Sequence, residues 1–328
     1  MAKNKSKRHK KVFRIRKRYL LLLTLLIVGG FCIFSRDKAY SSASAKIFYG
    51  ESFMKENGSE TKLSSVDSVE IPFQKEGANE HVAIKAQTYI AADRATMTPL
   101  LEKDAGKKVQ IASITKLMTA VITVENSKLD DVVTINSTFK DAPDGRMGLY
   151  VTEKITVENI LNGLLISSSN DAAEALAYYI GKGNYKSFIQ MMNTKAAEIG
   201  MSNTRFSNAM GLDNGENYST PQDLVYLANY ALKNEFIAKT VKTQEKRVKN
   251  IEGTSTHYLK TTDELLADKD FEFLGLKTGS TPEAGECLLS FAKTKNGHEI
   301  ITVVLGSMDR FGETKEIVKW VDANITWE

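Results

Sequence analysis

The alternation of hydrophobic and polar residues divides the chain into three parts. An uncharged, mostly apolar run covers residues 19–35, and residues 36–79 after it are polar with little periodicity. From about residue 80 to the C-terminus, segments with spacings near two or near 3.6 residues follow one another. The pattern therefore predicts a hydrophobic segment, a linker or stalk and one folded domain over 80–328.

The periodic segments of this domain predict strands towards its two ends and helices between them. Strands are expected at 82–93, 130–135, 285–294 and 298–307, the last two joined through an Asn-Gly turn. Helices are expected at 157–166, 170–180, 184–199 and 312–325, with two more opening at Ser113 and Thr220. This order predicts an α+β fold, in which helices and a helical subdomain flank an antiparallel β-sheet.

Short polar residues indicate where several of these helices begin. Thr156 is a predicted N-cap for the helix after it, and the Asp171/Glu174 spacing resembles a capping box. Thr220 precedes Pro221, and proline is favoured at the first position of a helix. These signals make the central part of the domain helical.

Charge is unevenly distributed along the chain. Residues 1–18 hold ten lysines and arginines and no acid, so the net charge of +4 leaves +4 − 10 = −6 for the remainder. We interpret residues 1–18 as a basic cytoplasmic tail. The acidic remainder gives no reason to expect nucleic-acid binding.

The apolar run at 19–35 is long enough to cross a membrane. Its seventeen residues, at about 1.5 Å each, span roughly 25 Å. Because the positive charge lies on the N-terminal side, the rest of the chain is expected outside a bacterial cell membrane, as in a single-pass protein. The alternative is a signal peptide cut after Ala43-Ser44-Ala45, which releases a secreted protein.

Cysteine and histidine give no sign of a disulfide or a metal site. Cys32 lies within the apolar run, so pairing with Cys287 is not expected, and no Cys-x-x-Cys occurs. The four histidines are scattered without metal-ligand spacing. We therefore expect neither a metal nor a cofactor.

The sequence Ser113-Ile114-Thr115-Lys116 places a hydroxyl and an amine three residues apart. On a helix this spacing puts both groups on one face, where the amine can serve as the base that a serine nucleophile needs. Ser-x-x-Lys occurs six times in the chain, so the motif alone is weak. The copy at Ser113 differs because it opens an apolar-periodic helix.

Two further motifs follow in order. Ser168-Ser169-Asn170 lies in a break between two predicted helices, where a polar loop can reach a cleft, although capping residues look the same. The second, Lys277-Thr278-Gly279, lies just before a predicted strand. A cation, a hydroxyl and a glycine that permits close backbone approach suit an anionic, peptide-like ligand, although an exposed turn has the same composition.

The ordered triplet resembles that of the penicillin-recognising serine enzymes. More widely, the chain resembles low-molecular-weight penicillin-binding proteins, the D-alanyl-D-alanine carboxypeptidases of the DacA type. Five stretches carry this resemblance: 112–120, 157–177, 188–213, 218–232 and 275–288. It implies a β-lactamase/DD-peptidase-like fold and removal of the terminal D-alanine from peptidoglycan stem pentapeptides. β-Lactams are then the expected inhibitors.

The resemblance also implies catalytic roles. Ser113 attacks the carbonyl between the two D-alanines and forms an acyl-enzyme, and Lys116 takes its proton. Ser168 and Asn170 relay protons and hold the peptide backbone. The backbone N–H groups of Ser113 and Ser280 form an oxyanion hole.

The resemblance further implies that the third motif and the residues around it bind the substrate. Lys277 and Thr278 are expected to bind the terminal carboxylate, while Gly279 lets the backbone approach. Arg310, after the strand at 298–307, is a further candidate for this carboxylate, and the alternative is a solvated charge at a strand end. The chain departs from the family at Ser169, where glycine is usual.

Three other functions remain open from the sequence. A DD-endopeptidase or transpeptidase shares the acylation chemistry and differs only in the acceptor. A class A-like β-lactamase needs a Glu-x-x-Leu-Asn sequence after the second motif, whereas Glu158 to Asn162 precedes it. A non-catalytic wall-binding module would not need the intact motif residues.

Overall fold

The computed structural model describes residues 69–78, 82–136 and 145–328. The predicted basic tail, the apolar run at 19–35 and the candidate cleavage site at 43–45 lie outside these residues. Within them, no helix combines the length and the hydrophobicity that a membrane crossing requires.

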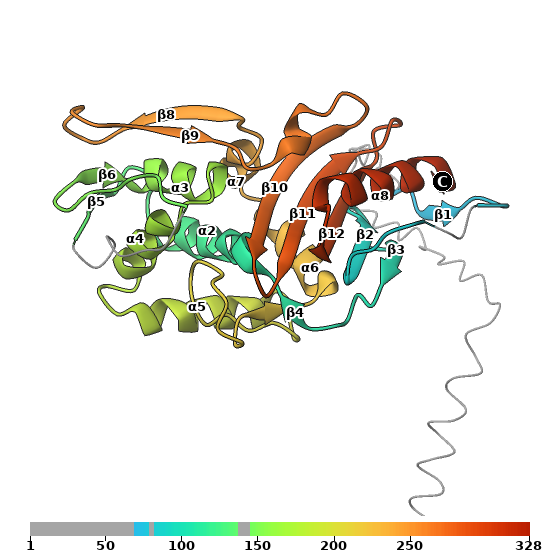
Figure 1. Ribbon diagram of the computed structural model, residues 1–328, viewed down its shortest axis with the longest axis horizontal. Coiled ribbons are helices and arrows are strands. Elements are labelled where there is room, and N and C mark those ends of the chain that lie inside the picture. The colour runs from blue at the N-terminus through green and yellow to red at the C-terminus, as the bar shows by residue number, and fades with distance from the viewer. Residues whose placement is uncertain (1–68, 79–81, 137–144) are drawn as a thin grey trace, which may run out of the picture. The chain divides into compact units, whose positions relative to one another are not determined.

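A five-stranded antiparallel sheet forms the centre of the fold, in the order β10-β11-β12-β2-β3 (Figure 1). Its strands are β2 (Thr88–Asp93), β3 (Pro99–Lys103), β10 (Glu272–Thr281), β11 (Gly285–Lys293) and β12 (Glu299–Ser307). β2 and β12 are neighbours although more than 200 residues separate them, as in the pairing of Ile300 with Asp93. The predicted antiparallel sheet and the hairpin between β11 and β12 are confirmed.

Both faces of the sheet are covered, so its central strands are apolar on both sides. Along β12, Val303 and Leu305 belong to the larger core, while Ile300 and Val304 face a smaller core with α8 (Arg310–Asn324). Val318 of α8 is fully buried in that smaller core. Strands of this kind form near-continuous hydrophobic runs.

The larger core is built by the helices between β3 and β10. They are α2 (Thr115–Asn126), α3 (Val157–Ile166), α4 (Asn170–Ile180), α5 (Tyr185–Glu198), α6 (Pro221–Ala231) and α7 (Glu235–Thr240). α2 lies at the centre, with every residue from Thr115 to Thr123 buried. This arrangement confirms the helical subdomain, and with the sheet the α+β class.

Several helices begin at the predicted caps. Thr156 accepts a hydrogen bond from Asn159 N at 3.2 Å, and Thr220 accepts one from Asp223 N at 3.1 Å. Each side chain satisfies a backbone donor that the first turn of a helix leaves free. α8 begins two residues earlier than expected, because Asp309 caps it by accepting from Gly312 N at 2.9 Å.

Short two-stranded sheets complete the described part of the chain. They pair β1 (Pro72–Gln74) with β13 (Ile325–Trp327), β4 (Val109–Gln110) with β7 (Tyr218–Ser219), β5 (Val132–Thr134) with β6 (Lys154–Thr156), and β8 (Glu245–Lys249) with β9 (Thr256–Lys260). Two 3-10 helices are η1 (Ala112–Ile114) and η3 (Glu264–Ala267). Figure 1 shows the β8–β9 hairpin beside α3.

Two strand predictions need correction. The strand predicted at 82–93 starts only at Thr88, because the backbone N–H groups of Lys85 and Ala86 donate to the Glu313 carboxylate of α8. The Lys-Thr-Gly motif lies within β10 and not before a strand, since Lys277 pairs with Leu289 of β11. The motif is therefore part of an edge strand of the sheet, and the alternative of an exposed turn is wrong.

The predicted capping box at Asp171 is wrong. α4 begins at Asn170 with Ser169 as its N-cap, and no side chain caps it. The Asp171 carboxylate instead accepts backbone N–H groups from Met147, Gly148 and Leu149, each at 3.0 Å. Asp171 thus orders a distant segment of the chain.

Candidate active site

The first motif is folded so that its serine and lysine touch. Ser113 lies in η1, directly before α2, and Lys116 lies in the first turn of α2. Lys116 Nζ is 2.7 Å from Ser113 Oγ and donates a second hydrogen bond to Met210 O at 2.8 Å. The lysine is fully buried, whereas the serine is half-buried and reachable.

Burial changes the chemistry of Lys116. Removal from water, and secondly the positive charge of Lys277, hold the pKa of Lys116 well below its usual value, while the charge of Asp171 opposes the shift. A lowered pKa makes the neutral, proton-accepting form of the Lys116 amine easier to reach. It can then accept the Ser113 proton across the short contact.

The loop after α5 supports the first motif through its backbone. Gly211 has φ of +89°, and a Cβ there would lie 1.9 Å from Ala112 O, so the two backbones meet where a side chain has no room. Asn208 Oδ1 accepts the N–H of Met210, Gly211 and Leu212 at 3.2, 2.6 and 3.1 Å. This turn aims Met210 O at Lys116.

The second motif stands between two helices, as predicted. Ser168 follows α3 and has φ of +58°, an uncommon conformation for a residue other than glycine. Its Oγ accepts a hydrogen bond from Lys277 Nζ at 2.8 Å. Asn170 is the first residue of α4, is 8% exposed, and donates its backbone N–H to Gly145 O at 2.6 Å.

The third motif reaches the other two from β10. Lys277 is 2% exposed, and burial together with the positive charge of Arg310 lowers the pKa of Lys277 to about 7. Thr278 Oγ1 lies 2.5 Å from Thr262 Oγ1. A Cβ at Gly279 would lie 3.0 Å from Ser113 N, so the missing side chain lets β10 pass close to the serine.

Charged residues surround this end of β10. Arg310 donates from Nη1 to Gly279 O at 2.9 Å, and its Nε has no hydrogen-bond partner among the described residues. Asp263 is 6% exposed, and burial raises the pKa of its carboxyl despite the nearby charges of Lys277 and Arg310. Arg310 is therefore part of this region and not a solvated charge.

All three motifs meet at one place. Ser113 comes from η1 and Lys116 from the start of α2. Ser168 comes from the turn between α3 and α4, Asn170 from the start of α4, and Lys277 from β10. Thr278, Gly279, Ser280 and Arg310 line the same stretch of β10 and the start of α8. The structure thus brings the residues of the three motifs and Arg310 together, and their roles in binding and catalysis stay a prediction.

Several neighbours of the site carried no recognisable signal in the sequence. Asp171 and Thr262 lie among residues of ordinary composition, so their residue types do not stand out in the sequence. Met210 contributes only its carbonyl oxygen. Asp263 lies before Lys277 in a segment that contains none of the three motifs. A backbone acceptor leaves no mark on residue type, so only a structure can find it.

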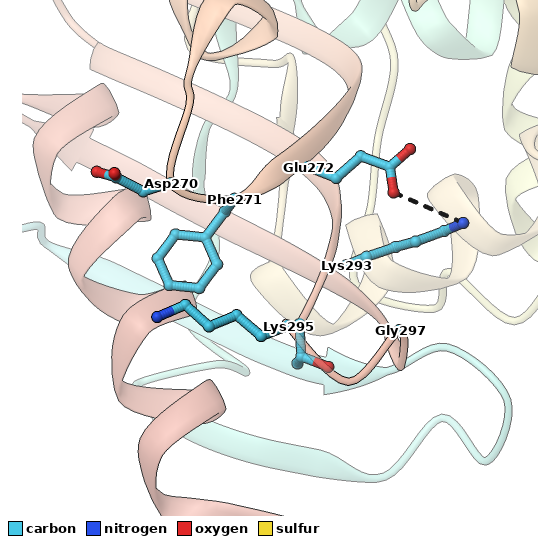
Figure 2. A pocket seen from close by; sticks show the side chains of 7 residues that line it. Asp270, Phe271, Glu272, Lys293, Lys295 and Gly297 are labelled. Carbon is cyan, nitrogen blue, oxygen red and sulfur yellow. Dashed lines mark ion pairs between the residues drawn. The ribbon is translucent and has the colours of Figure 1, made fainter.

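Glu158 does not belong to the site. It lies in the first turn of α3, its side chain is 47% exposed, and its Oε1 lies 3.8 Å from Lys246 Nζ on the β8–β9 hairpin. A further hollow lies at the far end of β10, lined by Phe271, Lys293 and Lys295 (Figure 2). It contains none of the motif residues.

Comparisons with known proteins find similarity to D-alanyl-D-alanine carboxypeptidases. The sequence profile of the peptidase S11 family, described as D-alanyl-D-alanine carboxypeptidase, matches residues 74–309. A D-alanyl-D-alanine carboxypeptidase of Streptomyces sp. (strain K15) is 38% identical over 66% of this chain and 79% of its own length. The carboxypeptidase DacF of Bacillus subtilis is 32% identical over 74% of this chain, which spans 62% of that relative's length.

Solved structures show the same fold. The crystal structure of the Streptomyces K15 DD-transpeptidase superimposes with a TM-score of 0.69 at 34% identity, covering 75% of this chain and all of that one. A D-alanyl-D-alanine carboxypeptidase from Mycobacterium tuberculosis has a TM-score of 0.70 at 25% identity over 76% of this chain and 96% of its own. The chain therefore belongs to the peptidase S11 family, the D-alanyl-D-alanine carboxypeptidases, which are serine peptidases.

Proposed function

We propose that this protein removes the terminal D-alanine from peptidoglycan stem pentapeptides, with Ser113 as the nucleophile. The observation that carries the proposal is the 2.7 Å contact between Ser113 Oγ and the buried Lys116 Nζ, beside the Lys277–Ser168 hydrogen bond. A buried amine with a lowered pKa next to a partly exposed hydroxyl is the arrangement that nucleophilic catalysis requires. The family and its D-alanyl-D-alanine carboxypeptidases support the substrate class.

Acylation begins when Lys116 accepts the Ser113 proton. The serine oxygen bonds to the carbonyl carbon of the penultimate D-alanine, and the bond to the nitrogen of the last D-alanine breaks. Ser168 passes its hydroxyl proton to the departing amine and takes one in return from Lys277, whose Nζ donates to Ser168 Oγ. Water then cleaves the Ser113 ester: its hydroxyl bonds to the carbonyl carbon of the shortened peptide, and its proton returns through Ser168 to Lys277. Lys116 gives its proton back to the Ser113 oxygen, which restores the serine hydroxyl.

The backbone N–H groups of Ser113 and Ser280 are proposed to bind the oxyanion. Ser113 N lies in η1, directly before α2, and the glycine at 279 brings β10 close to it. Preorganised donors of this kind contribute a large part of catalysis, about 3–4 kcal/mol per donor. Asn170, the first residue of α4, is proposed to hold the peptide backbone.

The terminal carboxylate of the substrate is assigned to Lys277, Thr278 and Arg310. Two cationic groups and a hydroxyl lie along one strand end, and Arg310 Nε has no partner within the described residues. A carboxylate placed there gains charge-assisted hydrogen bonds. This requirement favours a carboxypeptidase substrate, whose last residue ends in a free carboxylate.

A mass-spectrometric time course of the full-length protein in detergent with benzylpenicillin tests the proposal. We expect one drug adduct that persists and that the Ser113→Ala variant does not form. Release of D-alanine from a peptide ending in D-Ala-D-Ala then distinguishes turnover from binding alone. A wild-type protein without adduct and without D-alanine release would exclude the function and favour the non-catalytic wall-binding module.

A DD-endopeptidase or transpeptidase is the second candidate. The relatives include a D-alanyl-D-alanine endopeptidase of Haemophilus influenzae, 34% identical over 67% of this chain and 74% of its own length, and the DD-transpeptidase of Streptomyces K15. Acylation at Ser113 is common to all three reactions. Incubation with crosslinked muropeptides and with an added amine acceptor separates them by product mass.

The membrane location is also a proposal. The basic residues before the apolar run at 19–35 support an N-terminal anchor with the peptidase domain outside the cell. Extraction of membranes with alkaline carbonate and N-terminal sequencing of the mature protein test it. An intact N-terminus in the membrane pellet supports the anchor, whereas a soluble chain starting near Lys46 supports signal-peptide cleavage.

A further inference from the structure

A buried acid–histidine pair lies next to the second motif and has no part in the chemistry described above. His257 of β9 is 5% exposed and Glu153 is 1% exposed. His257 Nε2 lies 2.7 Å from Glu153 Oε1, and His257 Nδ1 lies 3.0 Å from Met147 O. The pair joins β9 to the residues that precede β6.

Both ring nitrogens of His257 face acceptors. A neutral imidazole has one N–H, so it can satisfy either the Glu153 carboxylate or the Met147 carbonyl, whereas an imidazolium donates to both. The hydrogen bond to Glu153 is the largest of the effects that raise the pKa of His257. The negative charges of Glu153 and Asp171 raise it further, against the effect of burial. The surroundings therefore favour the charged form.

Met147 connects this pair to the active site. Its carbonyl oxygen faces His257, while its N–H donates to Asp171 Oδ1 at 3.0 Å. The same short segment, residues 145–150, also presents Gly145 O to the backbone N–H of Asn170 at 2.6 Å. Segment 145–150 is thus held at Met147 by His257, and at Gly145 and residues 147–149 by Asn170 and Asp171 of α4.

Further contacts make this segment a rigid connection. Tyr150 N donates to the second oxygen of Glu153 at 3.2 Å, and Tyr150 OH accepts from Asn250 Nδ2 at 3.0 Å. The Met147 side chain occupies the space beside Gly163 of α3, where an added Cβ would lie 2.3 Å from Met147 Sδ. Movement of Met147 therefore has to move its neighbours on both sides.

We propose that His257, as an imidazolium paired with Glu153, is a positioning residue that holds segment 145–150 against α4 and so fixes the orientation of Asn170. The inference rests on the proposed function, because it takes Asn170 as a group that holds the substrate. His257 touches neither substrate nor reacting atoms. Its effect on the reaction passes through Met147, Gly145 and Asp171.

The test measures the acylation rate constant with benzylpenicillin and kcat and KM for D-alanine release, in the full-length protein. We expect His257→Gln to lower the acylation rate constant at least tenfold, and Glu153→Gln to lower it similarly. The double variant should be no slower than the slower single variant, because the two residues act as one unit. Glu299→Gln is the matched control, since it removes an ion pair with Arg94 on the sheet.

A second measurement uses the wild-type protein and so does not depend on any variant folding. The amide resonances of Met147 and Gly148 should shift with pH at the midpoint of the His257 ring resonances. Amides that do not follow the ring, or an unchanged acylation rate in a folded His257→Gln protein, would overturn the inference. Failure of the proposed function is distinct, because the wild-type protein itself would then form no adduct at Ser113.

Discussion

Lys277 Nζ donates a hydrogen bond to Ser168 Oγ at 2.8 Å, which joins the third motif to the second across 109 positions of sequence. The same amine donates to the carbonyl oxygen of Thr278 at 2.9 Å. One buried cation is therefore shared between the serine that is proposed to relay protons and the strand that is proposed to bind the carboxylate. Changes in its charge are expected to alter both steps.

Lys116→Ala is predicted to abolish most acylation while the fold remains. The variant removes the base from a site where Ser113 has no other amine within hydrogen-bonding distance among the described residues. Loss of general-base catalysis lowers rates by about 10²–10⁴-fold. The measurement is the rate of adduct formation with benzylpenicillin, and circular dichroism monitors the fold.

Lys107→Ala is the control for this variant, because Lys107 is exposed and lies outside the site. It should acylate at the wild-type rate. If Lys116→Ala also acylated normally, Lys116 would not be the base, and another group would have to accept the Ser113 proton.

Substrate affinity is predicted to weaken as pH rises through neutrality. The pKa of Lys277 is about 7, so its positive charge is lost above that pH and the terminal carboxylate loses a charged partner. A hydrogen bond to a charged group contributes about 1.5–3 kcal/mol, so KM should rise at least tenfold between pH 6 and pH 9. A peptide with a C-terminal amide lacks the carboxylate and should show a flatter profile. Equal profiles for the two peptides would contradict the assignment.

The Ser-x-x-Lys spacing brings the serine and lysine side chains together at one place in the chain and not at another. Ser113 and Lys116 meet because η1 and the first turn of α2 place them on one face. Ser290 and Lys293 have the same spacing, but they lie in β11, where residues three apart point to opposite faces. The helical periodicity after Ser113 was therefore the information that selected the right copy.

Much of the fold was predictable because its signals are local. The caps at Thr156 and Thr220 and the hairpin between β11 and β12 depend on residues close in sequence. The roles of Asp171 and His257 were not predictable, because their partners lie 22 to 24 and 110 residues away. In the sequence Asp171 looks like an acidic residue near the start of a helix. For this reason the capping-box prediction was wrong.

Glu158→Gln is predicted to leave the lifetime of the penicillin adduct unchanged within about twofold. In a β-lactamase a carboxylate placed at the site activates the deacylating water, but Glu158 is half-exposed and contacts Lys246. Loss of an exposed ion pair of this kind changes stability by less than about 1 kcal/mol. Adduct decay is followed by intact mass. A markedly longer lifetime in the variant would mean that Glu158 takes part in deacylation.

The Glu153–His257 pair is predicted to stabilise the fold more at low pH than at high pH. The pKa of His257 is raised on folding, so the folded state binds the proton more tightly than the unfolded chain. This stabilisation is complete below the unfolded pKa of about 6.5 and is lost as pH rises through the folded value. The difference in unfolding free energy between wild type and His257→Gln, from urea titrations, should therefore shrink from pH 6 to pH 9. A constant difference would indicate that folding does not raise the pKa of His257.

Gly211→Ala is predicted to destabilise the protein and to stop acylation. Gly215→Ala is predicted to destabilise the protein less and to affect acylation less. Both glycines have positive φ, +89° and +72°, so each alanine adds about 1–2 kcal/mol of backbone strain. Only at Gly211 does the new Cβ meet backbone, 1.9 Å from Ala112 O, and overpacking of this kind costs about 1–3 kcal/mol more. Because Ala112 directly precedes Ser113, relief of the clash has to displace the nucleophile.

Thermal unfolding and penicillin acylation of the two variants measure the difference. Equal stability and equal acylation in both would show that the contact between Gly211 and Ala112 does not position the serine.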